Sequence, residues 1–277
     1  MDRTKLAYWE SRASRPAGRP LPAPIRPTPE DAGFWESRLG ALCGSSEPLR
    51  ALLLGVTSSI ATLRWPARTE LLALDWSTAM IRRAWPAAGL PAWAAAVRGD
   101  WRQMPLRDAS RDLAIGDGCY AALASFGDCN ALNGEVARVL RDRGWYFLRC
   151  YLRPAAPQDP DALFAALHEG RVGEFEIFLW RLAMALHGEG RAGVRTDEVW
   201  RAWRERVPDH RPLFDRLGWS DAAHANMAQW GELRTRVPFP TLDEVAAMVA
   251  PRFELLECSY GSYEMGECCA RLVMRKR

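Results

Sequence analysis

A glycine and an aspartate follow two successive apolar runs, at a spacing that suits nucleoside binding. Gly55 follows the run at 51–54, and Asp75 follows the run at 71–74, twenty residues later. A glycine lets the backbone turn sharply after a strand, and an acid at the tip of the next strand accepts both hydroxyls of a ribose. A lone aspartate in such a place is also a common helix N-cap. The spacing from Gly55, together with the Ser77 that follows, favours the ribose role for Asp75.

The turn after the first run departs from the glycine-rich loop of a dinucleotide-binding fold. Where that loop carries repeated glycines, this chain has Gly55, Thr57 and Ser59. The repeated glycines allow backbone amides to approach a pyrophosphate closely. The hydroxyl-bearing residues therefore leave open which ligand the loop holds.

Two further segments place an acid beside a glycine or a tryptophan. Asp100 and Trp101 stand in GDW, and Asp117 and Gly118 stand in IGDGCY. Carboxylates accept hydrogen bonds from amino and hydroxyl groups, and an indole ring stacks on flat ligands. Trp101 is also typical of a core residue, and Asp117 of a turn residue. The residues alone leave both alternatives open.

Short apolar runs alternate with helical stretches and must position these residues. The runs lie at 51–54, 71–74, 112–115 and 145–150, and the helical stretches at 57–63, 77–84 and 130–141. Unbroken apolar runs of this length are typical of parallel strands buried on both faces. The alternation predicts an α/β fold with a doubly wound, Rossmann-like sheet. Its ligand loops then lie at the carboxyl ends of the strands.

The motifs of this segment occur in the order and spacing of a known family. After Gly55 come Asp-x-Ser-x-x-Met at 75–80, Gly-Asp at 99–100, Gly-Asp-Gly at 116–118 and Glu-x-x-Arg-Val-Leu at 135–140. This succession over residues 51–154 resembles the class I S-adenosylmethionine-dependent methyltransferases of the small-molecule type, with a degenerate first glycine loop. The resemblance implies S-adenosylmethionine as the cofactor and methyl transfer as the activity.

The resemblance implies roles at the nucleoside end of the cofactor for four residues. Asp75 holds the ribose, and Trp76 lies beside the adenine. Asp100 accepts from the adenine amino group, and Trp101 flanks the ring.

Four other residues are implied at the methionine end. Gly55 and Thr57 line the amino acid part, which has no phosphate, so the threonine hydroxyl serves as an added donor. Asp117 and Gly118 face the methionine portion and the transferred methyl group. No metal site is expected.

Residues 158–232 show helical periodicity with little strand signal, in the place where members of the family often build a substrate cap. Its tryptophans suggest an apolar or aromatic acceptor of modest size, although each one is also suited to packing the helices together. Trp180 in this segment and Tyr120 beyond Asp117 are the predicted substrate contacts. No catalytic base is assigned among the candidates, which are Asp117, Tyr120, Glu176, His168, His187, His210 and His224.

The two ends of the chain complete the predicted organisation. A short helix over TKLAYWESRA precedes a proline-rich stretch at 14–29, and Thr28 is the predicted N-cap of the next helix. This N-terminal part closes over the cofactor as a lid, bridges subunits or stays loose, and the sequence leaves all three open. At the other end, RFELLECSYGSY and CARLVMRK predict a final antiparallel strand pair.

Composition and charge exclude several classes of protein. The net charge is +3, and all but two of the 37 basic residues are arginines scattered along the chain, so nucleic-acid binding is not expected. No apolar run reaches the length of a membrane span, and the N-terminus has no apolar core of a secretory signal. Seven scattered cysteines without a Cys-x-x-Cys pair fit reduced thiols in the bacterial cytoplasm. A thiol site for a metalloid at Cys268 and Cys269 is a minor alternative.

The sequence therefore predicts four regions: an N-terminal helical and proline-rich arm at 1–48, a cofactor-binding core at 49–154, a helical substrate cap at 155–236, and a C-terminal helix and strand pair at 237–277. The predicted function is methyl transfer from S-adenosylmethionine to an oxygen, nitrogen or sulfur atom of a small organic molecule. The alternatives are a catalytically inactive relative that binds a ligand or partner, and a protein methyltransferase with an open groove. A homodimer is left open.

Overall fold

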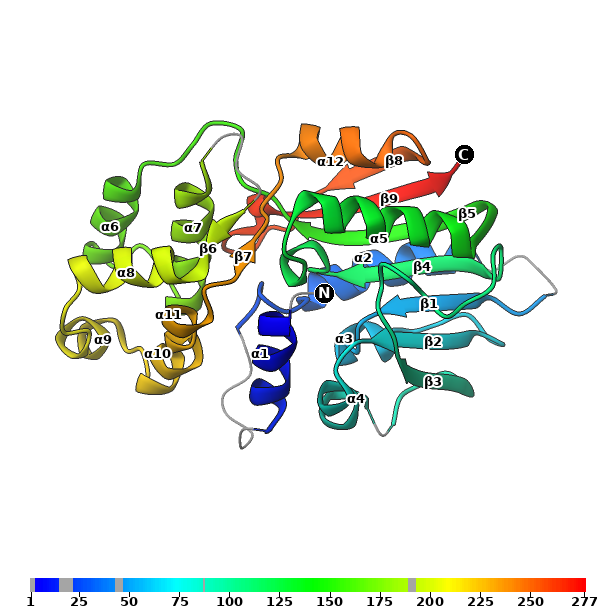
Figure 1. Ribbon diagram of the computed structural model, residues 1–277, viewed down its shortest axis with the longest axis horizontal. Helices are drawn as coiled ribbons and strands as arrows, with labels where there is room; N and C mark the ends of the chain where they lie inside the picture. Colours follow the sequence, from blue (N-terminus) through cyan, green and yellow to red (C-terminus); the bar gives the residue numbers. More distant parts are fainter. Residues whose placement is uncertain (1–2, 15–21, 43–46, 87, 189–192) are drawn as a thin grey trace.

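The computed structural model describes residues 3–14, 22–42, 47–86, 88–188 and 193–277 of the 277-residue chain. Its centre is a seven-stranded sheet with the order β3-β2-β1-β4-β5-β9-β8 (Figure 1). The strands are β1 (Arg50–Leu54), β2 (Glu70–Asp75), β3 (Trp93–Arg98), β4 (Arg111–Asp117), β5 (Leu140–Tyr151), β8 (Phe253–Ser259) and β9 (Cys269–Lys276). The first five are parallel, and β9 runs antiparallel to both β5 and β8. The predicted Rossmann-like sheet with a final antiparallel pair is confirmed.

Both faces of the sheet are covered, which explains the unbroken apolar runs. In β1, Leu52 and Leu54 join one core with α5 (Phe126–Val139) and α12 (Leu242–Val249). Ala51 and Leu53 point the other way and pack with α2 (Pro29–Gly40) and α3 (Ser58–Ala61). Because successive side chains of a strand alternate between faces, a strand covered on both sides must be apolar throughout.

Strand β3 is absent from the predicted runs, and its environment explains why. It forms one edge of the sheet and pairs only with β2 among the described strands. Its sequence is largely alanine, and Trp93 is 74% exposed. An edge strand with a partly exposed face gives no continuous apolar signal.

The N-terminal part contains the two expected helices, α1 (Arg3–Ser14) and α2. Thr28 is the N-cap of α2, as predicted, and forms a capping box with Asp31. Of the proline-rich stretch at 14–29, residues 15–21 lie outside the described part of the chain. Helix α1 packs against α4 (Thr78–Ala84) of the core and touches α11 (Trp230–Leu233).

A helical unit follows β5 and lies beside the carboxyl end of the sheet, as Figure 1 shows. It comprises α6 (Pro160–His168), α7 (Phe175–His187), α8 (Thr196–Arg206), α9 (Arg211–Leu217), α10 (Asp221–Ala228), α11 and the short pair β6 (Val194–Arg195) and β7 (Arg236–Val237). These helices share an aromatic core in which Phe175, Phe178 and Trp203 are fully buried. The structure thus contains a helical insertion at the predicted place, and we call this unit the cap.

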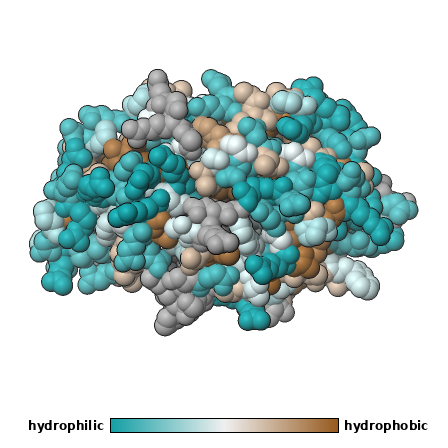
Figure 2. Space-filling model, viewed as in Figure 1, coloured by the Kyte–Doolittle hydropathy of each residue, from teal (hydrophilic) through white to brown (hydrophobic). Residues whose placement is uncertain are grey.

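The surface seen in Figure 2 is mostly hydrophilic, with smaller hydrophobic patches between the hydrophilic residues. No helix among the described residues combines the length and the apolar character that a bilayer span requires.

Candidate functional site

A cavity of about 360 Å³ lies where the sheet, the cap and α1 meet. Its floor is formed by the residues that follow the carboxyl ends of β1, β2 and β4. All eight residues predicted to bind a cofactor line this cavity: Gly55, Thr57, Asp75, Trp76, Asp100, Trp101, Asp117 and Gly118. Parallel strands bring their carboxyl ends to one edge of the sheet, which is why residues far apart in the sequence converge here.

Gly55 has a backbone that other residues avoid. Its φ is +94°, and its N–H donates to the carbonyl oxygen of Leu74 at 2.8 Å. The space beside it is bounded by the ring of Trp101 and the carboxylate of Asp75, at 3.6 Å and 3.8 Å from where a Cβ would lie. The glycine is therefore required by the turn, and it sets the loop directly beside the Asp75 carboxylate.

Asp75 stands at the tip of β2 and is largely buried in the cavity wall. Its Oδ1 accepts from the backbone N–H of Ser77 at 2.8 Å, and Ser77 itself is the N-cap of α4. The helix cap is thus supplied by the serine, which leaves the aspartate available to a ligand. Burial raises the pKa of Asp75, while backbone N–H donors lower it and the neighbouring Glu10 carboxylate raises it further.

Trp76, Asp100 and Trp101 form the wall next to Asp75. The Trp101 indole N–H donates to the carbonyl oxygen of Leu74 at 2.6 Å, which fixes its ring in the cavity wall. Asp100 holds Arg102 through two hydrogen bonds of 3.1 Å and 2.8 Å, and the guanidinium of Arg102 lies over the Trp76 ring. The Asp100 carboxylate thus already has a cationic partner, and a ligand amino group would share it.

Asp117 ends β4 and is held by a buried arginine. Its Oδ1 accepts from Nε of Arg149 at 2.5 Å, and the Arg149 side chain is 1% exposed. Burial raises the pKa of Asp117, and the charge and hydrogen bond of Arg149 oppose that rise. The adjacent Gly118 has a φ of +61°, and a Cβ there would come within 2.7 Å of the Tyr151 ring.

The matching family model supports the same assignment. Residues 52–148 match a family described as "Methyltransferase domain". The matched segment runs from within β1 to within β5 and contains every one of the eight residues above. Over these residues the chain is similar to methyltransferase domains, and the strand order of its sheet is Rossmann-like. No curated protein matches the chain at a significant level.

Solved structures share the fold of this chain at low sequence identity. A Rhodobacter sphaeroides protein described as of the zinc-dependent alcohol dehydrogenase type is 12% identical, with a TM-score of 0.62, and the match covers 99% of this chain and 98% of that one. The N-methyltransferase NodS from Bradyrhizobium japonicum, solved with S-adenosyl-L-homocysteine, is 11% identical, with a TM-score of 0.52 and coverage of 99% and 98%. At these identities the likeness concerns the fold alone.

The methyltransferase domain implies S-adenosylmethionine, and the residues present fit that molecule. Asp75 offers a carboxylate for two ribose hydroxyls, and Trp76 and Trp101 offer rings for a flat base. Thr57 is the N-cap residue of α3, yet its hydroxyl makes no capping hydrogen bond and is left for a ligand. No phosphate-binding glycine loop is needed, because this cofactor has no phosphate.

Of the two predicted substrate contacts, one lines the cavity and the other does not. Trp180 of α7 lines the cavity on its cap side, with its ring centroid 4.4 Å from that of Tyr151. Tyr120 does not line the cavity: its ring is 1% exposed, and its hydroxyl donates to Oδ1 of Asn133 at 2.9 Å. Because it begins a short 3-10 turn, the chain directs its ring into the core below α5 instead of toward the ligand.

Several lining residues were not predicted individually, although they belong to the N-terminal part and the cap. Lys5, Tyr8 and Trp9 of α1 form part of the wall, and Ile25 and Arg26 continue it. From the cap come Thr196, Met227, Trp230, Leu233, Thr235 and Val237. The only sequence signal for them was the aromatic character of the N-terminal helix and of the cap.

The remaining candidates lie outside this cavity. Neither Glu176 nor any of the four histidines lines it. His210 stacks on His224 within the cap, with their ring centroids 3.7 Å apart. Burial raises the pKa of Cys268 to about 11, so this thiol is held protonated. Among the described residues no cluster of histidine, cysteine or acidic side chains is suited to a metal ion.

Proposed function

We propose that this protein transfers the methyl group of S-adenosylmethionine to an oxygen, nitrogen or sulfur atom of a small organic molecule. The observation that carries the proposal is the convergence of the eight residues named above in one cavity, with the Asp75 carboxylate in its wall. The matching methyltransferase domain supports the reaction class.

The cavity has two chemically different halves, and we assign one ligand to each. The half formed by the ends of β1, β2 and β3 carries Asp75 and Asp100 and suits the polar nucleoside. The half formed by the cap carries Trp180, Trp230 and Met227 and suits an apolar or ring-bearing acceptor. Asp117 and Gly118 stand at the end of β4, and we assign them to the place where the methyl group is transferred.

The chain's contribution to the reaction is alignment and exclusion of water. When bound, the sulfonium supplies an already activated methyl group. The protein therefore has to hold the acceptor atom in line and keep water out, which the buried walls of α1 and the cap accomplish. The apolar lining on the cap side also strengthens any polar contact made inside it.

Isothermal titration with S-adenosylhomocysteine and S-adenosylmethionine tests the proposal. We expect both to bind the wild type and Asp75→Ala to lose at least about a hundredfold in affinity, because two charge-assisted hydrogen bonds disappear. Glu70→Ala is the matched control, since Glu70 is an exposed acid at the opposite end of the same strand. Its affinity should match the wild type.

Two outcomes would contradict the proposal in different ways. Absence of binding by the intact protein would remove S-adenosylmethionine as its ligand. Binding without methyl transfer to any member of a metabolite extract, followed with labelled donor, would instead support a ligand-binding relative without turnover.

A further inference from the structure

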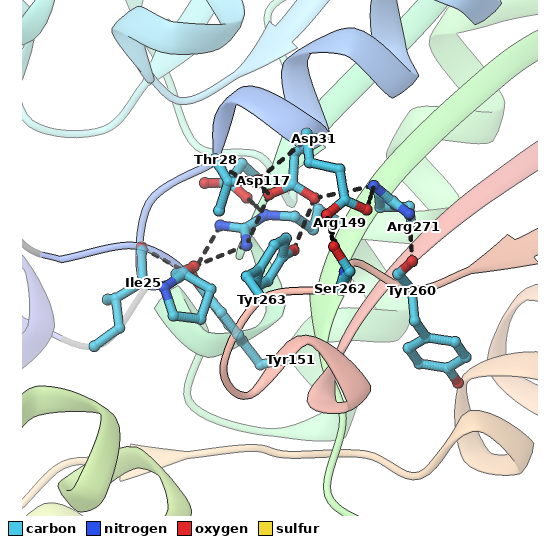
Figure 3. Close-up of polar contacts among 12 residues, drawn as sticks. Ile25, Thr28, Asp31, Asp117, Arg149, Tyr151, Tyr260, Ser262, Tyr263 and Arg271 are labelled. Carbon is cyan, nitrogen blue, oxygen red and sulfur yellow. Dashed lines mark hydrogen bonds and ion pairs between the residues drawn. The ribbon is translucent and has the colours of Figure 1, made fainter. Parts of the chain in front are cut away.

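Four charged side chains are almost fully withdrawn from water where β4, β5 and β9 meet the N-terminal segment (Figure 3). Asp31 is 0% exposed, Arg149 1%, Arg271 6% and Asp117 7%. Two acids and two arginines balance in charge, which offsets much of the cost of burying each one. Only Asp117 among the four also lines the cavity.

Arg149 links two parts of the cavity wall through one guanidinium. Its Nε donates to Asp117 Oδ1 at 2.5 Å, and its Nη1 donates to the carbonyl oxygen of Pro24 at 2.8 Å. The Tyr151 hydroxyl, 3.2 Å from Nη2 of Arg149, donates to the carbonyl oxygen of Ile25 at 2.8 Å. Arg149 therefore fixes the orientation of Asp117 and, through the same planar group, the segment that carries the wall residue Ile25.

The second oxygen of Asp117 has a different situation from the first. Oδ1 accepts from Arg149, whereas no hydrogen bond from the described residues reaches Oδ2, and part of the side chain stays exposed. A carboxylate oxygen can only accept, so a group that satisfies Oδ2 must bring an N–H or O–H. The lining residues Ala121 and Ala122 carry no polar side chain, and the Lys5 ammonium group beside them donates to the carbonyl oxygens of Ala121 and Leu123 instead.

We propose that Asp117 Oδ2 receives the N–H or O–H of the methyl acceptor, and that Arg149 is the positioning residue that keeps the Asp117 carboxyl group oriented for this task. The inference rests on the proposed function and narrows the class of acceptor. The acceptor is a compound with a hydroxyl group or an amine N–H, and not a thioether or another compound whose acceptor atom carries no proton.

The proton balance of the reaction gives this carboxylate a role. Two bonds break: the acceptor's O–H or N–H bond and the bond between sulfur and the methyl carbon. A new bond forms between the acceptor oxygen or nitrogen and the methyl carbon. The electron pair of the sulfur–methyl bond stays on sulfur. Asp117 Oδ2 takes the released proton and passes it to water after the products have left. Arg149 favours the charged form of Asp117, Asp31 disfavours it, and burial disfavours it most.

The first experiment measures the ionisation of Asp117 without any ligand. The carboxyl carbon signal of Asp117 is assigned by its loss in Asp117→Asn and followed by NMR as the pH changes. Arg149→Gln should raise the midpoint by at least one pH unit, because a favourable charge is lost. Asp31→Asn, a substitution in the same buried cluster, should lower it. An unchanged midpoint in both variants would overturn the positioning role.

The second experiment tests the acceptor class with matched probes. Naphthol and its methyl ether, and aminonaphthalene and its dimethyl derivative, are titrated calorimetrically into the protein saturated with S-adenosylhomocysteine. The member with a free O–H or N–H should bind about tenfold more tightly, the effect of one hydrogen bond to a charged group. In Asp117→Asn the preference should fall to within about threefold, whereas Asp31→Asn should retain it.

The outcomes separate this inference from the proposed function. Equal binding of the paired probes, binding of none of them, or an unchanged preference in Asp117→Asn would overturn the role of Asp117 while leaving cofactor binding intact. Failure of S-adenosylhomocysteine to bind would overturn the proposed function itself. If Arg149→Gln does not fold, Arg149→Lys replaces it, because this variant keeps the positive charge. The titration midpoint of Asp117 in Arg149→Lys should stay near that of the wild type, while the preference for probes with a free O–H or N–H weakens.

Discussion

The two halves of the cavity are built by different means. The half at the strand ends uses residues that follow their strands directly, such as Gly55, Asp75 and Asp117, so its geometry follows from the sheet. The half at the cap uses Tyr151 from β5 and Trp180 from α7, which lie side by side because the cap packs on the core. Short-range motifs specify the first half, and long-range packing specifies the second.

The comparison of the two halves predicts the largest loss of cofactor affinity from a change in the loop that follows β1. Gly55→Val should weaken S-adenosylhomocysteine binding by at least about a hundredfold and cost about 1–3 kcal/mol of unfolding free energy, because a β-branched residue does not tolerate a φ of +94°. Calorimetry and urea unfolding measure the two effects. Gly33→Ala in α2, where nothing lies within 4 Å of the added Cβ, is the control and should be neutral or slightly stabilising. Tight binding by Gly55→Val would show that this loop does not set the site.

A change in the cap half should separate stability from cofactor binding. Trp180→Ala removes ring contacts with Tyr151, Trp230 and Phe239 and should cost about 2–3 kcal/mol of unfolding free energy. S-adenosylhomocysteine affinity should change by less than about threefold, because the nucleoside lies in the other half. Urea unfolding and calorimetry check this. A loss of cofactor affinity as large as that in Asp75→Ala would abolish the division into halves.

Acid should affect the cap before it affects the sheet. Burial and the neighbouring His210 lower the pKa of His224 to about 4, below its usual value of 6.5. The unfolded chain then binds a proton more readily than the folded one, so stability falls as the pH drops below 6.5 and continues to fall until about pH 4. At pH 5 the cost is about 1–2 kcal/mol. His224→Gln should remove this part of the acid sensitivity in unfolding curves recorded at pH 5 and pH 7; identical sensitivity would argue against it.

The smallest effect is expected where α1 meets the strand-end half. The Ser77 hydroxyl donates to Glu10 Oε1 at 2.7 Å, and the Glu10 carboxylate also raises the pKa of Asp75. S-adenosylhomocysteine binding should weaken as the pH falls and Asp75 takes up a proton. Glu10→Gln should shift that midpoint to lower pH by a few tenths of a unit, because one negative charge is removed. A shift to higher pH in the binding titration would contradict this arrangement.

The same contrast explains what could be predicted from the sequence. The strands at 51–54 and 71–74, the N-cap at Thr28 and the eight lining residues follow from local patterns, and local patterns persist in the fold. Strand β3 was missed because its edge position leaves Trp93 exposed. Tyr120 follows Asp117 closely in sequence, yet a short 3-10 turn directs its ring into the core.

The part contributed by distant segments had no usable local signal. In the sequence, Arg149 is one arginine among many. Its positioning role depends on its hydrogen bonds to Pro24 and Asp117, which lie far from it along the chain. The same holds for Ile25 and Trp230, whose lining role depends on how the N-terminal segment and the cap pack.

A crystal structure of the protein with S-adenosylhomocysteine tests the central claim most directly. We predict ribose hydroxyls within hydrogen-bond distance of the Asp75 carboxylate and an adenine against Trp76 or Trp101, with the space beside Trp180 free for an acceptor. A nucleoside bound on the cap side, or an Asp75 carboxylate that makes no contact with it, would contradict the account.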